Sequence, residues 1–309
     1  MLLNKSSPVV YGPVPSRRLG RSLGIVNLFP KQCSYACIYC QLGRTKKTRV
    51  NRGTFYTPSE IYRAVSEKID KSYQAELPVD YLTFVPTGEP AIDENLGATI
   101  KLLKPLGIKI AIISNASMLF KKDVQNDFQM ADYISLKLDA ITKDIWNILN
   151  RPNHNLDFDK IMKAILDFRK IYKGTLVTET MFVRGINDMD YEANLLADKI
   201  SLIGPDIAYL AFPIRPPAEK WVDIPEEGEV LRLYQTFSKK IDRVEYLIDF
   251  EGSDFDYDNK DIKTSILDIT RVHPLREDTL KQMLDRAKEK EYIINELLIK
   301  KQIIKAHYL

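Results

Sequence analysis

The sequence predicts an α/β fold: a partial (βα)6-type TIM-like barrel with a small C-terminal helical, winged-helix-like appendage. Short apolar runs alternate with amphipathic helical patterns, which is typical of repeated right-handed βαβ units. The apolar runs are continuous, as expected for strands that are buried on both faces of a parallel sheet. The number of units fits a partial barrel better than a closed eight-stranded one. An open doubly wound sheet is the alternative architecture.

The predicted elements follow one another regularly along the chain. The predicted strands occupy residues 23–29, 81–85, 108–113, 134–138, 176–183, 207–212 and 244–248. The first helix is expected to begin at Thr57-Pro58-Ser59-Glu60, a capping-box pattern with proline at the first helical position. The remaining barrel helices are predicted at residues 96–104, 143–149, 160–172, 191–202 and 227–239.

The composition divides the chain into three parts. Residues 1–250 are expected to form the barrel with a basic N-terminal segment, residues 251–261 an acidic, turn-rich linker, and residues 262–309 the appendage. The appendage is predicted to contain helices at 262–270, 278–284 and 289–301 and a strand at 302–308. Because its charges nearly cancel, a helical cap or partner-docking module is favoured over a module that binds duplex DNA.

Composition and charge limit the class of protein. Of 309 residues, 45% are hydrophobic and 28% are charged, as in soluble globular proteins. The N-terminus lacks the apolar run of a signal peptide, and no stretch approaches the ~20 apolar residues of a membrane span. We therefore expect a cytoplasmic, reducing location and no membrane partner.

The first 59 residues contain ten Lys or Arg and no Asp or Glu. This positive charge could attract a substrate that carries phosphate, such as RNA. It could equally offset an anionic cofactor or simply coat the surface.

The three cysteines of the chain, Cys33, Cys37 and Cys40, lie within eight residues in a C-x3-C-x2-C pattern. An odd number of cysteines without sign of secretion argues against a disulfide framework. Three thiolates can hold three corners of an iron–sulfur cluster, and the missing fourth cysteine leaves one iron open to another ligand. The alternatives are three unrelated buried thiols or a zinc site, but structural zinc usually has four protein ligands and the three histidines are distant in sequence.

Distinctive polar residues follow most of the predicted strands. They include Thr87-Gly88-Glu89-Pro90, Ser114-Asn115, Lys137 with Asp139, residues 184–188 and residues 215–219. In parallel barrels the C-terminal ends of the strands share one face, which holds the active site. These motifs are therefore expected to converge with the cysteines, and their convergence predicts an enzyme.

With these motifs, the chain resembles the radical S-adenosylmethionine (SAM) superfamily over roughly residues 11–250. It is most similar to the branch of wyosine-synthase-like Fe–S oxidoreductases. The motifs that carry the resemblance are residues 15–24 (PSRRLGRSLG), 37–45 (CIYCQLGRT), 87–90 (TGEP), 150–152 (NRP), 185–188 (GIND) and 215–219 (RPPAE).

The resemblance implies the cofactors and the reaction. Cys33, Cys37 and Cys40 would hold a [4Fe–4S] cluster, and the amino and carboxylate groups of SAM would chelate the fourth iron. Reduction would cleave SAM to a 5′-deoxyadenosyl radical that abstracts hydrogen from a substrate. A low-potential electron donor of the flavodoxin or ferredoxin type would supply the electron, and RNA is one candidate among several substrate classes.

The resemblance also implies a SAM-binding wall. Tyr39 would pack near the adenine, or serve as a core aromatic. Gly88, Glu89 and Pro90 match the motif that holds the SAM amino group, and Thr87 replaces its usual first glycine. Ser114 and Asn115 would contact the SAM carboxylate or ribose, with helix capping as the alternative.

Charged residues of the later strands complete the predicted site. Lys137 and Asp139 are two residues apart and should point to one face of their strand, as ligand contacts or as a structural pair. Glu179 interrupts an apolar strand, so its carboxylate should meet a cation, such as Lys137, or the ligand. Arg215 is the candidate for an anionic substrate group, or else forms an interdomain salt bridge.

Two function classes remain alternatives to a radical SAM enzyme. One is an iron–sulfur sensor or regulatory protein with a winged-helix module and no turnover, and the other is a structural zinc protein. Wyosine synthesis itself is not assigned, because the wyosine synthases that the chain resembles use a second cluster from extra cysteines and a lysine that captures pyruvate. This chain has no spare cysteine.

Overall fold

The computed structural model describes residues 9–16, 18–74, 76–85, 87–247, 262–270, 275–287 and 292–305. A single eight-stranded sheet follows the sequence order from β1 to β8. Its strands are β1 (Val10–Ser16), β2 (Gly20–Ile25), β3 (Tyr81–Phe84), β4 (Lys109–Ser114), β5 (Tyr133–Lys137), β6 (Thr175–Met181), β7 (Ile207–Ala211) and β8 (Val244–Tyr246). Strands β2 to β8 are parallel, and β1 runs antiparallel to β2.

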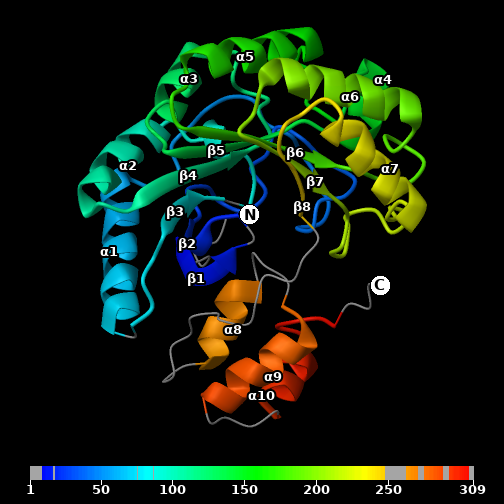
Figure 1. The fold of residues 1–309 in the computed structure, drawn as a ribbon. Helices are drawn as coiled ribbons and strands as arrows, with labels where there is room; N and C mark the ends of the chain where they lie inside the picture. Colours follow the sequence, from blue (N-terminus) through cyan, green and yellow to red (C-terminus); the bar gives the residue numbers. More distant parts are fainter. Residues whose placement is uncertain are drawn as a thin grey trace.

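Helices cover the outer side of this curved sheet (Figure 1). They are α1 (Pro58–Gln74), α2 (Leu96–Leu103), α3 (Lys122–Phe128), α4 (Lys143–Leu149), α5 (Phe158–Ile171), α6 (Asp190–Ile203) and α7 (Glu227–Ser238), with short 3-10 helices η1 (Pro90–Ile92) and η2 (Lys104–Leu106). Because β1 and β8 form the two edges of the sheet, the barrel is partial, as predicted.

The predicted start of the first helix is confirmed in detail. The backbone N–H of Thr57 donates to Glu60 Oε2 at 2.7 Å, and the backbone N–H of Glu60 donates to Thr57 Oγ1 at 3.2 Å. This reciprocal capping box satisfies backbone groups that a helix start leaves unpaired.

Two elements were not anticipated from the sequence. Strand β1 contains Pro13 and Pro15, which remove backbone donors, so its sequence lacks a strand pattern. Prolines are tolerated there because β1 is an edge strand. Helix α3 is short and polar, with only Val124 and Phe128 buried, and gives no clear helical period. The strand predicted at 23–29 is β2, which ends at Ile25.

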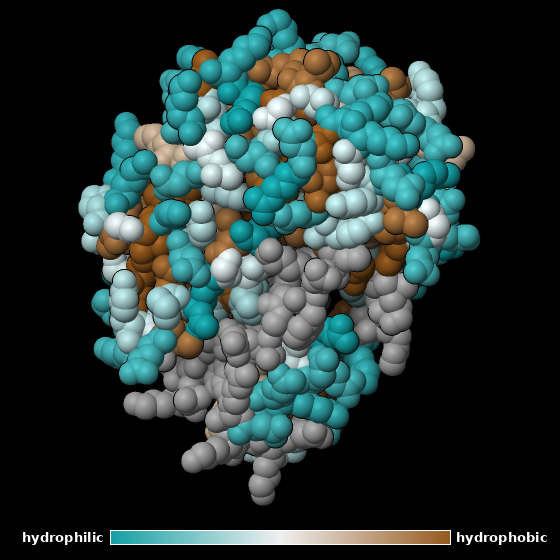
Figure 2. Space-filling view, viewed as in Figure 1, coloured by the Kyte–Doolittle hydropathy of each residue, from teal (hydrophilic) through white to brown (hydrophobic). Residues whose placement is uncertain are grey.

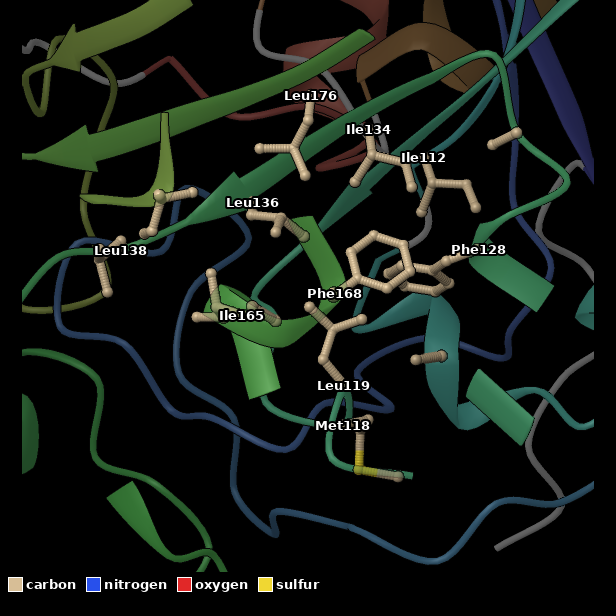
Figure 3. Packing of buried hydrophobic residues seen from close by; sticks show 14 of the residues in the cluster. Ile112, Met118, Leu119, Phe128, Ile134, Leu136, Leu138, Ile165, Phe168 and Leu176 are labelled. Carbon is tan, nitrogen blue, oxygen red and sulfur yellow. The ribbon is translucent and has the colours of Figure 1, made fainter. Parts of the chain in front are cut away.

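The main core lies between the sheet and the outer helices (Figure 3). Phe128 of α3 and Phe168 of α5 meet edge to face, with ring centroids 6.3 Å apart. Ile112, Ile134 and Leu176, from three neighbouring strands, are fully buried in the same cluster. This packing fixes the strands, and therefore fixes the loops that follow them.

The C-terminal segment forms three helices, α8 (Ile262–Thr270), α9 (Glu277–Arg286) and α10 (Tyr292–Ile299). They pack against β1, where Tyr11 and Val14 join Ile266, Met283 and Leu297 in a second apolar cluster (Figure 1). The predicted linker lies outside the described residues. The strand predicted at 302–308 is wrong for residues 302–305, where a bend at Gln302 and Ile303 is followed by irregular chain, and residues 306–309 lie outside the described part.

Hydrophilic side chains cover most of the face shown in Figure 2, with apolar residues between them. None of the helices in the described part of the chain combines the length and the apolar composition needed to cross a membrane.

Candidate active site

A cavity of about 310 Å³ lies at the C-terminal ends of the parallel strands. Most of the residues singled out from the sequence line it, namely Cys33, Cys37, Tyr39, Cys40, Thr87, Gly88, Glu89, Ser114, Asn115, Lys137, Glu179 and Arg215. Pro90 and Asp139 are not among the lining residues. Pro90 is buried at the start of η1, and Asp139 lies behind Tyr39.

Each cysteine has a nitrogen donor beside its sulfur. Asn115 Nδ2 lies 3.6 Å from Cys33 Sγ, Asn150 Nδ2 lies 3.5 Å from Cys37 Sγ, and Lys31 Nζ lies 3.9 Å from Cys40 Sγ. Hydrogen bonds of this kind favour thiolates and tune the potential of a bound iron–sulfur cluster.

The free thiols of Cys33 and Cys37 are poorly ionised. Burial raises the pKa of Cys33 above its ordinary range, and burial together with the charge of Asp139 raises the pKa of Cys37 to about 12. A positively charged metal group would reverse this by stabilising the thiolates. Within the described residues, no group of three or more His, Cys, Asp and Glu side chains is already gathered to hold a metal ion.

Gly88 allows the second strand-end loop to touch the cysteine segment. A Cβ atom at Gly88 would lie 1.9 Å from the backbone oxygen of Gln32. The backbone N–H of Glu89 donates to that oxygen at 2.9 Å, and the N–H of Lys31 donates to the Thr87 oxygen at 2.9 Å. Glycine is therefore required at position 88 for close backbone approach beside Cys33.

The Glu89 carboxylate joins the segment after β3 to the end of β4 at the cavity wall. Its Oε1 accepts hydrogen bonds from Ser114 Oγ at 2.7 Å and from the Ala91 N–H at 3.1 Å, and its Oε2 accepts one from the Asn115 N–H at 2.7 Å. All three donors are neutral. Burial raises the pKa of Glu89 to about 7, and these hydrogen bonds offset burial only in part. The oxygen Oε2 keeps acceptor capacity for a ligand.

Tyr39 is held by groups behind it. Its hydroxyl donates to Asp139 Oδ2, and Asn150 Nδ2 donates to the same carboxylate oxygen at 2.8 Å. Asp139 Oδ1 also accepts from the Met181 N–H at 2.9 Å. Asp139 is therefore a positioning group for Tyr39. Asn150 was not singled out as a site residue, although the NRP motif at 150–152 contained the signal.

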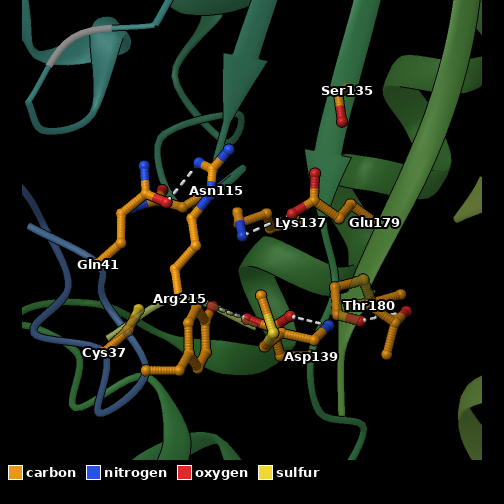
Figure 4. Close-up of polar contacts among 12 residues, drawn as sticks. Cys37, Gln41, Asn115, Ser135, Lys137, Asp139, Glu179, Thr180 and Arg215 are labelled. Atoms are coloured by element: carbon orange, nitrogen blue, oxygen red, sulfur yellow. Dashed lines mark hydrogen bonds and ion pairs between the residues drawn. The ribbon is translucent and has the colours of Figure 1, made fainter. Parts of the chain in front are cut away.

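Glu179 pairs with two cations, Lys137 and Arg18, and Figure 4 shows the pair with Lys137. Its Oε1 lies 2.8 Å from Lys137 Nζ, and its Oε2 pairs with Arg18 NH1. The Lys137 ammonium also lies 5.2 Å from the centre of the Tyr39 ring. The expected cation partner of Glu179 is thus present. Arg18 enters the barrel from the turn after β1, and because that strand was not predicted, its role was not anticipated.

These charges stabilise one another. Burial alone would raise the pKa of Glu179, but Lys137 and Arg18 hold it well below its ordinary range. Burial alone would lower the pKa of Lys137, but the nearby Glu179 and Asp139 carboxylates together outweigh burial and raise it. Both groups are therefore charged at neutral pH.

Arg215 extends from the loop after β7 to the cavity, where its NH1 donates to Gln41 Oε1 at 2.7 Å (Figure 4). The partner Gln41 follows Cys40 directly, so Arg215 links the last strand-end motif to the cysteine segment. Its side chain lines the cavity, as expected for a residue that could face a substrate.

The residues present fit an iron–sulfur cluster with SAM. The three thiols have nitrogen donors, the Glu89 wall supplies acceptors for an ammonium, and Lys137 supplies a donor for an anion. The buried hydroxyl of Thr87, at the same cavity, has no hydrogen-bond partner among the described residues. Buried polar groups are nearly always paired, so this hydroxyl suits a ligand contact.

Comparison with known proteins agrees with this geometry. The family model of the radical SAM superfamily matches residues 27–196. A UPF0026 protein of Methanocaldococcus jannaschii is 39% identical over 302 residues, which cover 97% of this chain and 93% of that protein.

Solved structures share the fold at low sequence identity. TYW1 with a lysine-pyruvate adduct bound gives a TM-score of 0.55 at 17% identity, over 72% of this chain and 74% of that chain. SuiB of Streptococcus suis bound to S-adenosylmethionine gives a TM-score of 0.54 at 14% identity, over 77% of this chain and 54% of that chain. TYW1 is a wyosine synthase, so the resemblance to the wyosine-synthase-like branch extends to the fold.

Members of the superfamily are enzymes that use a [4Fe–4S] cluster and SAM, and the predictions of an enzyme and of these cofactors are confirmed at that level. The family match, the close relative and the fold lead to one conclusion. The chain belongs to the radical SAM superfamily and, within it, is a UPF0026 protein.

Proposed function

We propose that the chain cleaves SAM reductively and uses the resulting 5′-deoxyadenosyl radical to abstract hydrogen from an organic substrate. One observation supports this most directly. The three cysteines and the Thr87–Glu89 wall line the same cavity, and backbone hydrogen bonds at 2.9 Å join Thr87 and Glu89 to Lys31 and Gln32, which precede Cys33. When bound, the cluster and SAM would supply the electron and the radical chemistry.

The residues of the chain have distinct proposed roles. Cys33, Cys37 and Cys40 hold the cluster. Glu89 accepts from the SAM ammonium, and Thr87 adds a hydrogen bond beside it.

The other side chains of the cavity orient the ligand. Lys137 donates to an anionic group of the ligand. The ring of Tyr39 lies next to the Lys137 ammonium. Ser114 and Asn115 act through Glu89 and Cys33, because their hydrogen bonds go to those residues. Arg215 faces a substrate group at the cavity.

A lysine adduct of the kind bound in TYW1 is not proposed for Lys137. A lysine must be neutral to attack a carbonyl, but Glu179 keeps Lys137 charged. We therefore propose an electrostatic role for Lys137. RNA is one candidate substrate, supported by the basic N-terminal segment. The proposed location is cytoplasmic, and a flavodoxin or ferredoxin is the proposed reductant.

Anaerobic reconstitution with iron and sulfide tests this function. We expect a brown protein that forms 5′-deoxyadenosine from SAM on reduction, and we expect Cys37→Ala to lose both colour and cleavage. Ser66→Ala, on the outer helix α1, is the matched control and should keep both. Colour without cleavage, together with retention of duplex DNA, would favour the sensor. A colourless zinc adduct would favour the structural alternative.

A further inference from the structure

A basic surface borders the cysteine segment. Arg44 and Arg151 each place a nitrogen 2.5 Å from an oxygen of Glu219. Glu219 is buried, with 4% of its side chain exposed, whereas the side chains of Arg44 and Arg151 are 72% and 44% exposed. Exposed Lys46 and Lys47 follow Arg44, and exposed Lys220 follows Glu219. We call this set the basic rim, and it consists of Arg44, Lys46, Lys47, Arg151 and Lys220.

The basic rim lies directly beside the predicted cluster ligands. The backbone N–H of Glu219 donates to the oxygen of Ile38 at 3.0 Å, and Ile38 follows Cys37. The backbone N–H of Gly43, which precedes Arg44, donates to the oxygen of Cys40 at 2.9 Å. No residue of the basic rim lines the cavity. Whatever contacts the basic rim can therefore stay outside the cavity while approaching the cysteines.

Trp221 gives this surface an apolar anchor. It follows Lys220 and is 57% exposed, although the next residue, Val222, is buried against Ile38 and Tyr39. Tryptophan and arginine are the residues that most often dominate the binding energy of protein interfaces. The nearby acidic Asp223 lies 3.2 Å from Arg184, so its charge is paired.

Resting on the proposed function, we propose that the basic rim and Trp221 form the docking surface for an acidic electron-transfer protein. Electron tunnelling weakens steeply with distance, so a donor must bind on the surface nearest the cysteines. Opposite charge steers such a protein to the correct face. The docked protein is oxidised by one electron, and this electron reduces the centre that the three cysteines hold.

The same charges would attract the phosphates of RNA. The location of the basic rim favours the electron donor. A substrate must enter the cavity to lose hydrogen, and no residue of the basic rim lines the cavity. RNA binding at the basic rim is therefore treated as an outcome that contradicts the proposal.

Charge reversal tests the docking surface. The double variant Lys47→Glu/Lys220→Glu changes two exposed side chains without touching the Arg44–Glu219–Arg151 contacts. Trp221→Ala is a second, independent variant. The matched control is Lys173→Glu, an exposed lysine before β6 at the opposite ends of the strands. Reconstituted proteins are titrated calorimetrically with purified flavodoxin and with a low-potential ferredoxin, at low and high salt.

We expect the double variant to bind one of these donors about tenfold more weakly at low salt, with less difference at high salt. Formation of 5′-deoxyadenosine with that donor should slow in parallel. With dithionite, a small chemical reductant, all variants should match the wild-type chain, because dithionite needs no docking surface.

Equal donor binding by the double variant, Trp221→Ala and Lys173→Glu would overturn the proposal. So would loss of binding to a short single-stranded RNA with donor binding unchanged. If the wild-type chain forms no 5′-deoxyadenosine even with dithionite, the proposed function is wrong. The calorimetric titrations then still test the docking surface, because they measure donor binding and not SAM cleavage.

Discussion

Two buried glutamates on the wall of one cavity have opposite electrostatic environments. Glu89, beside the cysteines, accepts only neutral donors, and burial raises its pKa to about 7. Glu179, on β6, lies between Lys137 and Arg18, and its pKa is lowered. Burial is similar for both, so the partners decide the difference. The comparison shows that the charge of Glu179 is already balanced by two cations of the chain. Glu89 has no such partner among the described residues and can still pair with the cation of a ligand.

Of the substitutions that test this comparison, Glu179→Gln is expected to change the free energy of unfolding most. The variant leaves two cations in the barrel without their carboxylate, and we expect a loss of about 3–5 kcal/mol in the free energy of unfolding. Denaturant unfolding measures it. Glu245→Gln is the control, because Glu245 pairs with Arg243 at the surface and should change stability by about 0–1 kcal/mol. Equal losses in both variants would show that the Glu179 cluster is not held as described.

The wall around Glu89 should be disrupted by Gly88→Ala. The new methyl group would meet the Gln32 backbone, and overpacking of this kind costs about 1–3 kcal/mol. Iron content after reconstitution should fall as well, because Gln32 precedes Cys33. Gly228→Ala is the control, since a Cβ there has no atom within 4 Å. Normal iron binding by Gly88→Ala would contradict the close approach.

The raised pKa of Glu89 predicts a pH-dependent stability. The folded protein holds a proton on Glu89 that the unfolded chain releases near pH 4.5, so this stabilisation is present below pH 4.5 and is lost as pH rises towards 7. Glu89→Gln cannot titrate. The difference in unfolding free energy, wild type minus Glu89→Gln, should fall by about 1–3 kcal/mol between pH 4.5 and 8.

A flat difference would show that the pKa of Glu89 is ordinary. Glu179 has the opposite sign, because its stabilisation is present above pH 4.5 and is lost only as pH falls below that value. Comparing the two Gln variants across pH therefore separates the two environments.

The smallest effect is expected from Thr87→Val. The hydroxyl has no partner among the described residues, so stability should change by no more than about 0.5 kcal/mol. If the hydroxyl contacts bound SAM, affinity for SAM should fall by about 0.5–1.5 kcal/mol, measured by equilibrium binding to the reconstituted protein. Unchanged affinity would remove Thr87 from the proposed site.

Local patterns in the sequence were sufficient to predict most of the barrel. Strands buried on both faces require continuous apolar runs, and helices need caps such as Thr57 and Glu60, so both leave a local record. The three closely spaced cysteines likewise predicted a cluster site, because ligand spacing is a local property. Strand β1 left no such record, because an edge strand tolerates prolines and its pairing with β2 is not encoded in an apolar run.

The sequence by itself determined the fold class, the cysteine triad and the convergence of strand-end motifs on one face. Only the tertiary structure decided how each side chain is used. It placed Asp139 behind Tyr39, brought Arg18 across the barrel to Glu179, and set Gly88 against Gln32. The physical reason is that spacing constrains only neighbours along the chain, whereas charge pairing and close approach depend on residues distant in the chain, such as Arg18 and Glu179, which are 161 positions apart.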